Sequence, residues 1–186
     1  MNKAFIVAVK EETGGLESIF NIPVFYCGVG KINSTIKTLD MINSGVDEII
    51  NIGSCGSDKY PLGTILKIGK VFQDIDGTPI CDYGHTPFEN DSESIILSND
   101  SEVTCFTTDY FFDVNQKEKY SMNYLNKIYE SSVVDMECFS IAKVCKLKGV
   151  KFSSFKWVSD SGGFDDWIRN CKIGLKNFET EFLKNI

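Results

Sequence analysis

A chain of 186 residues with 42% hydrophobic and 24% charged residues has the composition of one globular domain, and we assign residues 1–186 to it. Its formal net charge of −7 argues against a nucleic-acid partner, and no apolar run is long enough to cross a membrane. Seven cysteines lack the C-x-x-C spacing and histidine occurs once, as His85, so neither a disulfide framework nor a metal site is expected.

The N-terminal part of the chain is expected to alternate strands with helices. Three apolar runs predict strands of a buried sheet: residues 4–9, 24–27 and 47–52. A short helix is expected from Glu12 to Phe20. Apolar residues at helical spacing predict a longer helix over 31–43, which Ser44-Gly45 closes.

The remainder of the chain adds strands in its middle and helices towards its end. Further strands are expected within 62–72 and at 95–97, 103–106 and 151–159. Further helices are expected within 115–130, over 136–148 and from about 164 to 183. Residues 73–92 are rich in Asp, Gly, Pro and Asn, a composition that predicts a loop. This order predicts an α/β fold: a single domain with a mixed, largely parallel central sheet flanked by helices.

Two glycine motifs follow predicted strands. Gly28-Val29-Gly30 precedes a helix, but Asn33 occupies the place of the third glycine of a dinucleotide-binding fingerprint, so a tight turn near a ligand is favoured over a phosphate loop. Gly53-Ser54-Cys55-Gly56 is expected to form a turn whose backbone amides could come close to a ligand. A plain turn explains this second motif equally well.

Three acidic residues, Glu12, Glu137 and Asp160, follow apolar runs that predict strands. Each has a simple structural explanation, because acids are favourable in the first turn of a helix or as a cap. However, the carboxyl ends of strands meet at one edge of an α/β sheet, where ligands bind. Since a carboxylate can accept hydrogen bonds from both hydroxyls of a vicinal diol, the set is suited to holding a ribose and the base attached to it.

Five segments, in this order, resemble the purine nucleosidase and nucleoside phosphorylase superfamily, and within it the 5′-methylthioadenosine/S-adenosylhomocysteine nucleosidases. The segments are Ala8-x-x-Glu11-Glu12, Gly28-Val29-Gly30-Lys31, Ile50-Asn51-Ile52-Gly53-Ser54-Cys55-Gly56, Val134-Asp135-Met136-Glu137 and Val158-Ser159-Asp160. The resemblance extends over most of the chain, and its most specific part is the stretch from Val134 to Cys145.

The resemblance implies a role for each residue of the site. Met136 and Glu137 would bind the ribose, Asp160 would donate a proton towards N7 of the purine, and Glu12 would activate the attacking water. Phe111 would stack on the base, and the backbone of Phe112 would read its edge. Cys55, Gly56 and Ser159 would complete the base site, and Ser54, Val29 and Lys156 would line the pocket.

The implied reaction is hydrolysis of the N-glycosidic bond of a purine nucleoside, such as 5′-methylthioadenosine or S-adenosylhomocysteine, with release of adenine. Acid and base carboxyl groups on opposite sides of the sugar suit its oxocarbenium-like transition state. A phosphorylase is the alternative, but phosphorylases of this superfamily hold phosphate with several arginines, and Arg169 is the only arginine here. A non-catalytic nucleoside-binding relative is a further alternative.

The resemblance also implies a homodimer, in which a neighbour completes the 5′ pocket, and no metal or organic cofactor. Seven cysteines without a disulfide pattern suit a reducing cytoplasm. Two departures from the family pattern are evident. Lys156 stands where nucleosidases usually carry an arginine, and the segment before Val24 is expected to lack a hairpin that they usually carry.

Overall fold

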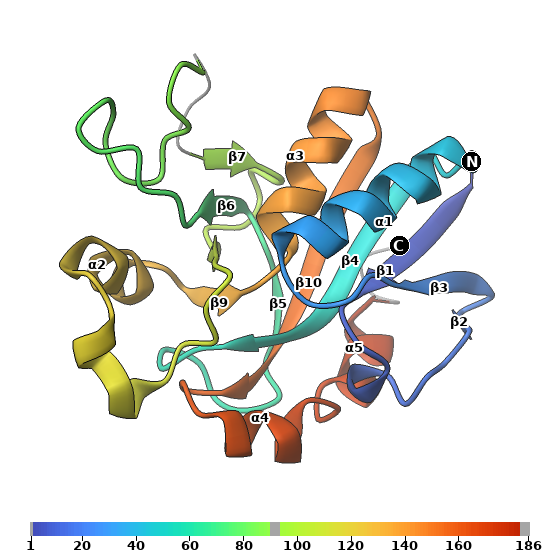
Figure 1. The fold of residues 1–186 in the computed structure, drawn as a ribbon. Helices are drawn as coiled ribbons and strands as arrows, with labels where there is room; N and C mark the ends of the chain where they lie inside the picture. The colour runs from blue at the N-terminus through green and yellow to red at the C-terminus, as the bar shows by residue number, and fades with distance from the viewer. Residues whose placement is uncertain (1, 90–93, 183–186) are drawn as a thin grey trace.

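A mixed sheet forms the centre of the computed structural model, which describes residues 2–89 and 94–182 (Figure 1). The first part of the chain forms β1 (Lys3–Val7), the 3₁₀ turn η1 (Lys10–Glu12), β2 (Ser18–Ile19), β3 (Ile22–Tyr26), α1 (Lys31–Asn43), β4 (Glu48–Gly56), β5 (Ile65–Lys67) and β6 (Lys70–Gln73). The second part forms β7 (Ser94–Ile96), β8 (Thr104–Thr107), η2 (Val114–Lys119), α2 (Met122–Glu130), β9 (Val133–Asp135), α3 (Cys138–Lys148), β10 (Lys151–Asp160), α4 (Phe164–Asn170) and α5 (Leu175–Phe182).

The strands are ordered β2-β3-β1-β4-β9-β8-β6-β7, and β10 pairs with both β4 and β5. Strands β3, β1, β4 and β10 form parallel pairs, as do β9, β8 and β6. The two parallel groups meet where β4 and β9 pair antiparallel, at Gly56 and Val134. The predicted α/β class with a mixed, largely parallel sheet is confirmed. Among the described residues, no helix is long and apolar enough to cross a bilayer.

The alternation of side chains along β1 shows how the sheet is covered on both faces. Ala4 and Ile6 belong to a core that includes Met41 of α1 and Ile141 of α3. The next residues along β1 face the other way, into a core with the aromatic rings of α5, where Phe5 and Phe178 make an edge contact with centroids 6.0 Å apart. Helices α1 and α3 therefore cover one face and α5 the other (Figure 1). This explains why β1 reads as a continuous apolar run.

The prediction of a helix from Glu12 to Phe20 is wrong. The chain forms the short turn η1 and then a hairpin in which β2 pairs antiparallel with β3. Phe20 and Asn21, which join these strands, both have positive φ, of 52° and 62°, as a two-residue hairpin turn requires. Gly14 also has positive φ and is incompatible with a regular helix. A short hairpin therefore lies in the segment where a helix was expected.

Two other boundaries differ from expectation. Residues 53–56 do not form a turn, because β4 continues through them to Gly56 and pairs with β10. The last predicted helix is divided into α4 and α5. Between them Gly174 lies so close to Trp157 that a Cβ there would be 2.1 Å from the Cβ of Trp157. Of the predicted loop at 73–92, Gln73 is the last residue of β6, residues 74–89 form a loop, and 90–92 lie outside the described residues.

Candidate active site

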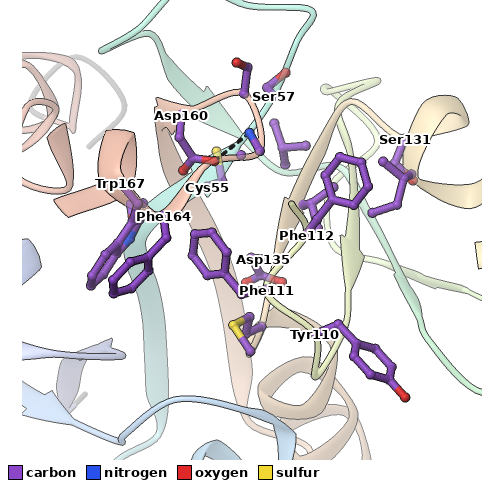
Figure 2. A pocket seen from close by; sticks show the side chains of 18 of the residues that line it. Cys55, Ser57, Tyr110, Phe111, Phe112, Ser131, Asp135, Asp160, Phe164 and Trp167 are labelled. Carbon is purple, nitrogen blue, oxygen red and sulfur yellow. Dashed lines mark hydrogen bonds between the residues drawn. The ribbon is translucent and has the colours of Figure 1, made fainter. Parts of the chain in front are cut away.

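A cavity of about 480 Å³ opens at the edge of the sheet where β4 and β10 end (Figure 2). Its walls come from η1, the end of β4, residues 110–114, the β9–α3 junction and the β10–α4 loop. All three acids singled out in the sequence, Glu12, Glu137 and Asp160, line it. The cavity therefore brings together carboxyl groups that are far apart in the chain.

Most of the other predicted site residues also line this cavity: Val29, Ser54, Cys55, Gly56, Phe111, Phe112 and Met136. Ser159 and Lys156 are the exceptions. Both are buried behind the wall, with exposed fractions of 0% and 2%. They contact carboxyl groups that line the cavity: Lys156 pairs with Asp135, and Ser159 donates a hydrogen bond to Asp160.

Glu12 is held at the cavity wall by the backbone and side chain of Ser54. The Oε1 atom accepts hydrogen bonds from the Ser54 amide and from the Ser54 hydroxyl, both at 2.6 Å. Gly53 makes this approach possible, since a Cβ at that position would be 2.9 Å from Glu12 Oε1. Burial raises the pKa of Glu12, although Lys156 and Ser54 favour its ionised form. A buried carboxyl group of this kind is suited to accept a proton.

Aromatic rings form the wall opposite Phe112 in Figure 2. Trp167 stacks on Phe164 with centroids 5.9 Å apart, and Phe111 meets the Phe164 ring edge-on at 5.6 Å. The Trp167 indole also donates a hydrogen bond of 2.9 Å to Ser54 Oγ, which ties α4 to the residue that holds Glu12. Trp167 was not predicted, because the pattern of the last helix does not indicate that its indole reaches β4.

Glu137 lies between β9 and α3, where it is the N-cap residue of the helix. Its Oε1 atom accepts a 3.0 Å hydrogen bond from the amide of Gly30, a residue with φ of 93°. The Gly28-Val29-Gly30 turn thus directs an amide at a carboxyl group. Burial raises the pKa of Glu137 to about 8, and the nearby charge of Asp135 adds to the effect.

Asp135, which also lines the cavity, forms a buried ion pair of 2.7 Å with Lys156. Asp135 also accepts hydrogen bonds from the amide of Cys138 at 2.9 Å and from the hydroxyl of Thr107 at 2.6 Å. The pair with Lys156 and these hydrogen bonds outweigh burial and keep the pKa of Asp135 below its ordinary value. Asp135 thereby caps the first turn of α3 and fixes the residue beside it.

Asp135 was missed as a site residue, although the sequence holds a signal for its partner. Lys156 lies within the apolar run of β10, and a lysine buried in a strand requires a counter-ion. The sequence did not show which acid would supply it. With Cys105 and Cys138, Asp135 is also the one group among the described residues whose ligand atoms cluster closely enough for a metal. The Lys156 ammonium contacts that carboxylate, so the arrangement disfavours a cation.

Asp160 ends β10, and its carboxylate is oriented by its own neighbours. Oδ1 accepts a 2.9 Å hydrogen bond from the Gly162 amide, and Oδ2 accepts one of 2.8 Å from the Ser159 hydroxyl. The pairing of β10 with β4 shifts register just before Asp160, the kind of irregularity that redirects a side chain. Ser159 is therefore placed to orient Asp160 from behind.

Comparison with known proteins agrees with this fold. A family model described as the phosphorylase superfamily matches residues 20–182. A 5′-methylthioadenosine/S-adenosylhomocysteine nucleosidase from Bacillus pumilus (strain SAFR-032) is 24% identical over 204 residues, covering 96% of this chain and 87% of the relative.

Solved structures from Helicobacter pylori are similar over nearly their whole length. A 5′-methylthioadenosine/S-adenosylhomocysteine nucleosidase in complex with butyl-thio-DADMe-Immucillin-A has a TM-score of 0.80 and 22% identity, covering 100% of this chain and 99% of that one. A futalosine hydrolase has a TM-score of 0.79 and 20% identity, covering 99% and 97%. At this level of identity the likeness establishes the shared fold.

Proposed function

Because this chain belongs to the phosphorylase superfamily, we propose that it is a purine nucleosidase that hydrolyses the N-glycosidic bond of 5′-methylthioadenosine or S-adenosylhomocysteine and releases adenine. One observation carries the proposal: Glu12, Glu137 and Asp160 line a single cavity. The similarity to the nucleosidase from Bacillus pumilus supports the choice of substrate.

In this proposal Glu137 binds the ribose. Its carboxyl group lies at the start of α3 with one oxygen already bound to the Gly30 amide, which fixes its direction. It can then exchange hydrogen bonds with the 2′- and 3′-hydroxyls of the sugar. Met136, beside it on the cavity wall, packs against the ribose.

Asp160 and Glu12 act on the bond to be broken. Asp160 donates a proton towards N7, which makes the purine a better leaving group. Glu12 accepts a proton from the water that attacks the anomeric carbon from the opposite face. The hydrogen bonds from Ser159 and Gly162 orient Asp160, and Ser54 orients Glu12, so neither acid needs to reorganise during the reaction.

The purine is placed between the aromatic wall and the end of β4. Phe111 is 37% exposed at the cavity and offers a ring face to the base. The Phe112 backbone reads the edge of the base, and Cys55 and Gly56 line the opposite side. Gly56 leaves room for Asp160, since a Cβ there would be 3.2 Å from Asp160 Oδ1.

We further propose that the chain acts as a homodimer in the cytoplasm. Val29, Phe111 and Phe164 surround the cavity and are 45%, 37% and 56% exposed, an apolar surface that a second copy would cover. All seven cysteines are free thiols, in keeping with a reducing compartment. Light scattering after size-exclusion chromatography tests the assembly. A mass corresponding to twice 20.9 kDa is expected, and a monomer at micromolar concentration would refute the dimer.

Incubation with a panel of purine nucleosides, with and without phosphate, tests the proposed reaction. Release of adenine from 5′-methylthioadenosine or S-adenosylhomocysteine in phosphate-free buffer is expected. An absolute requirement for phosphate would instead identify a phosphorylase. Ligand-induced thermal stabilisation without turnover would identify a nucleoside-binding protein.

A further inference from the structure

The cavity extends along β9 from Glu137 to Ser131. Every residue from Ser131 to Glu137 lines it, so the cavity follows β9 and the segment that leads into it. At about 3.3 Å per extended residue, this wall is up to roughly 20 Å long. A purine nucleoside, measured from its ribose to the far edge of its base, is about half as long. With the ribose at Glu137, the end of the cavity near Ser131 therefore remains available.

The far end of the cavity is an apolar slot with a polar rim. Figure 2 shows Phe112 and Ser131 on this side of the cavity, opposite Phe164 and Trp167. The walls of the slot are Phe112, Val114, Ile128 and Val134, and its rim consists of Ser57, Asp58, Lys117, Tyr129 and Ser131. Such a lining favours an apolar group whose outer end reaches water.

Hydrogen bonds fasten the loop after β4 to the end of α2 and to the segment that leads into β9. The Lys59 ammonium donates to the carbonyl oxygens of Tyr129 at 2.7 Å, Glu130 at 3.1 Å and Ser131 at 2.7 Å. In the same loop Ser57 Oγ donates to the carbonyl of Ser132 at 2.7 Å. These contacts form a wall that exists before any ligand binds.

The position of Asp160 indicates which part of a purine faces the slot. The 6-amino group of adenine and N7 lie on the same edge of the base. If N7 is directed at Asp160, the 6-amino group is directed past Asp160 towards its neighbours in the slot. Ser57 is such a neighbour, since its amide donates a 2.8 Å hydrogen bond to the carbonyl of Asp160.

We propose that this slot is a subsite for a substituent on the 6-amino group, so that the chain accepts nucleosides of N6-substituted adenine carrying an aromatic or branched aliphatic group. This rests on the proposed nucleosidase function and specifies its substrate class. The substituent is stabilised by burial of its apolar surface against Phe112, Val114 and Ile128. A site closed at the edge of the base would exclude such a group by steric overlap.

The test compares 5′-methylthioadenosine with its N6-benzyl derivative. The wild-type protein is expected to hydrolyse the derivative with a kcat/KM within about tenfold of the parent. Val114→Phe narrows the slot. It is expected to lower the kcat/KM of the benzyl derivative relative to that of 5′-methylthioadenosine by about tenfold or more. Ile96→Phe is the matched control, because Ile96 is exposed on β7 away from the cavity, and the ratio should not change.

Two results would overturn the subsite. One is a wild-type protein that hydrolyses the parent but discriminates against the benzyl derivative by about a hundredfold or more. The other is a Val114→Phe variant in which both substrates lose activity equally. If neither nucleoside is hydrolysed, the proposed function fails, and calorimetric titration with N6-benzyladenine still decides on the subsite. Tighter binding than adenine supports it, and equal or weaker binding refutes it.

Discussion

The carboxyl group of Asp160, the candidate acid, is oriented by its immediate neighbours in the chain. Both of its oxygens accept hydrogen bonds from residues within two positions along the chain, and its side chain remains at the cavity. The neighbouring Ser159 and Gly162 thus form a local frame that orients the carboxyl group. The frame is independent of the nucleoside, so the role of Asp160 can be tested without disturbing the fold.

Asp160→Asn is expected to lower kcat by about 10² to 10⁴, because the amide cannot donate the proton that the leaving purine requires. The amide oxygen can still accept the hydrogen bond from Gly162, so the melting temperature should stay close to that of the wild type. Initial rates of adenine release and thermal unfolding check both parts. Wild-type rates in this variant would remove Asp160 from the mechanism.

Glu12→Gln is expected to abolish hydrolysis while nucleoside affinity is retained, because the amide cannot take a proton from water and the proposed mechanism gives Glu12 no contact that binds the substrate. Isothermal titration with 5′-methylthioadenosine measures the affinity. The matched control is Glu11→Gln, the same chemical change at an exposed neighbour, which should leave both quantities unchanged. A collapse of affinity in the Glu12 variant alone would make it a binding or structural residue.

Glu137→Gln is expected to stabilise the unliganded protein at pH 7 to 8 and to have little effect at pH 5. The folded-state pKa of Glu137, about 8, lies above the ordinary value of 4.5, so the folded protein retains a proton that the unfolded chain releases. Stability is therefore lost as the pH rises from the ordinary pKa of 4.5 to the folded-state pKa of about 8, and the neutral amide of Gln avoids that loss. The gain at pH 7.5 should be roughly 2 kcal/mol or more.

Urea unfolding across pH 5 to 8 measures this difference. Glu118→Gln, at an exposed position, serves as the control and should show no such pH dependence. A Glu137→Gln variant that is less stable than the wild type at pH 7.5 would show that the carboxyl group is ionised and favourably paired in the folded protein.

Among the secondary-structure elements, the start of α3 is held by residues from three strands. Asp135 of β9 caps Cys138, Thr107 of β8 accepts a 2.9 Å hydrogen bond from the Phe139 amide, and Lys156 of β10 neutralises Asp135. Three strands therefore set the position of one helix end. Because Glu137 lies at that end, the position of the proposed ribose ligand depends on this buried network.

Asp135→Asn and Lys156→Met are each expected to destabilise the protein by about 3 kcal/mol or more, because each leaves a buried group of the pair without its partner. The double variant should lose clearly less than the sum of the two, since neither charge remains buried alone. Equilibrium unfolding of the four proteins completes the cycle. Strict additivity would show that the two charges do not stabilise each other.

At the scale of the whole molecule, the sequence predicted those elements whose pattern is local. Helices α1 and α3 and strands β1 and β10 have clear apolar runs or helical spacing, and they lie close to where they were expected. Elements defined by backbone conformation were missed. The β2–β3 hairpin depends on positive φ at Phe20 and Asn21. Asn tolerates this conformation but Phe rarely adopts it, so the pair does not match the Asn-Gly pattern that marks such a turn.

The candidate site was predictable to a similar degree. Acids at strand ends were found because the sheet gathers them at one edge, and the cavity brings them together. The contacts behind them were not found. The pairing of Lys156 with Asp135 and the reach of Trp167 to Ser54 join residues distant in the chain, and periodicity carries no information about which distant residues meet.

A crystal structure of the Asp160→Asn variant with bound 5′-methylthioadenosine would show whether the three acids surround the nucleoside as proposed. The ribose hydroxyls are expected within about 2.6 to 3.2 Å of Glu137, with N7 facing residue 160 and a water between Glu12 and the anomeric carbon. A nucleoside bound outside this cavity, or with its base rather than its sugar at Glu137, would contradict it.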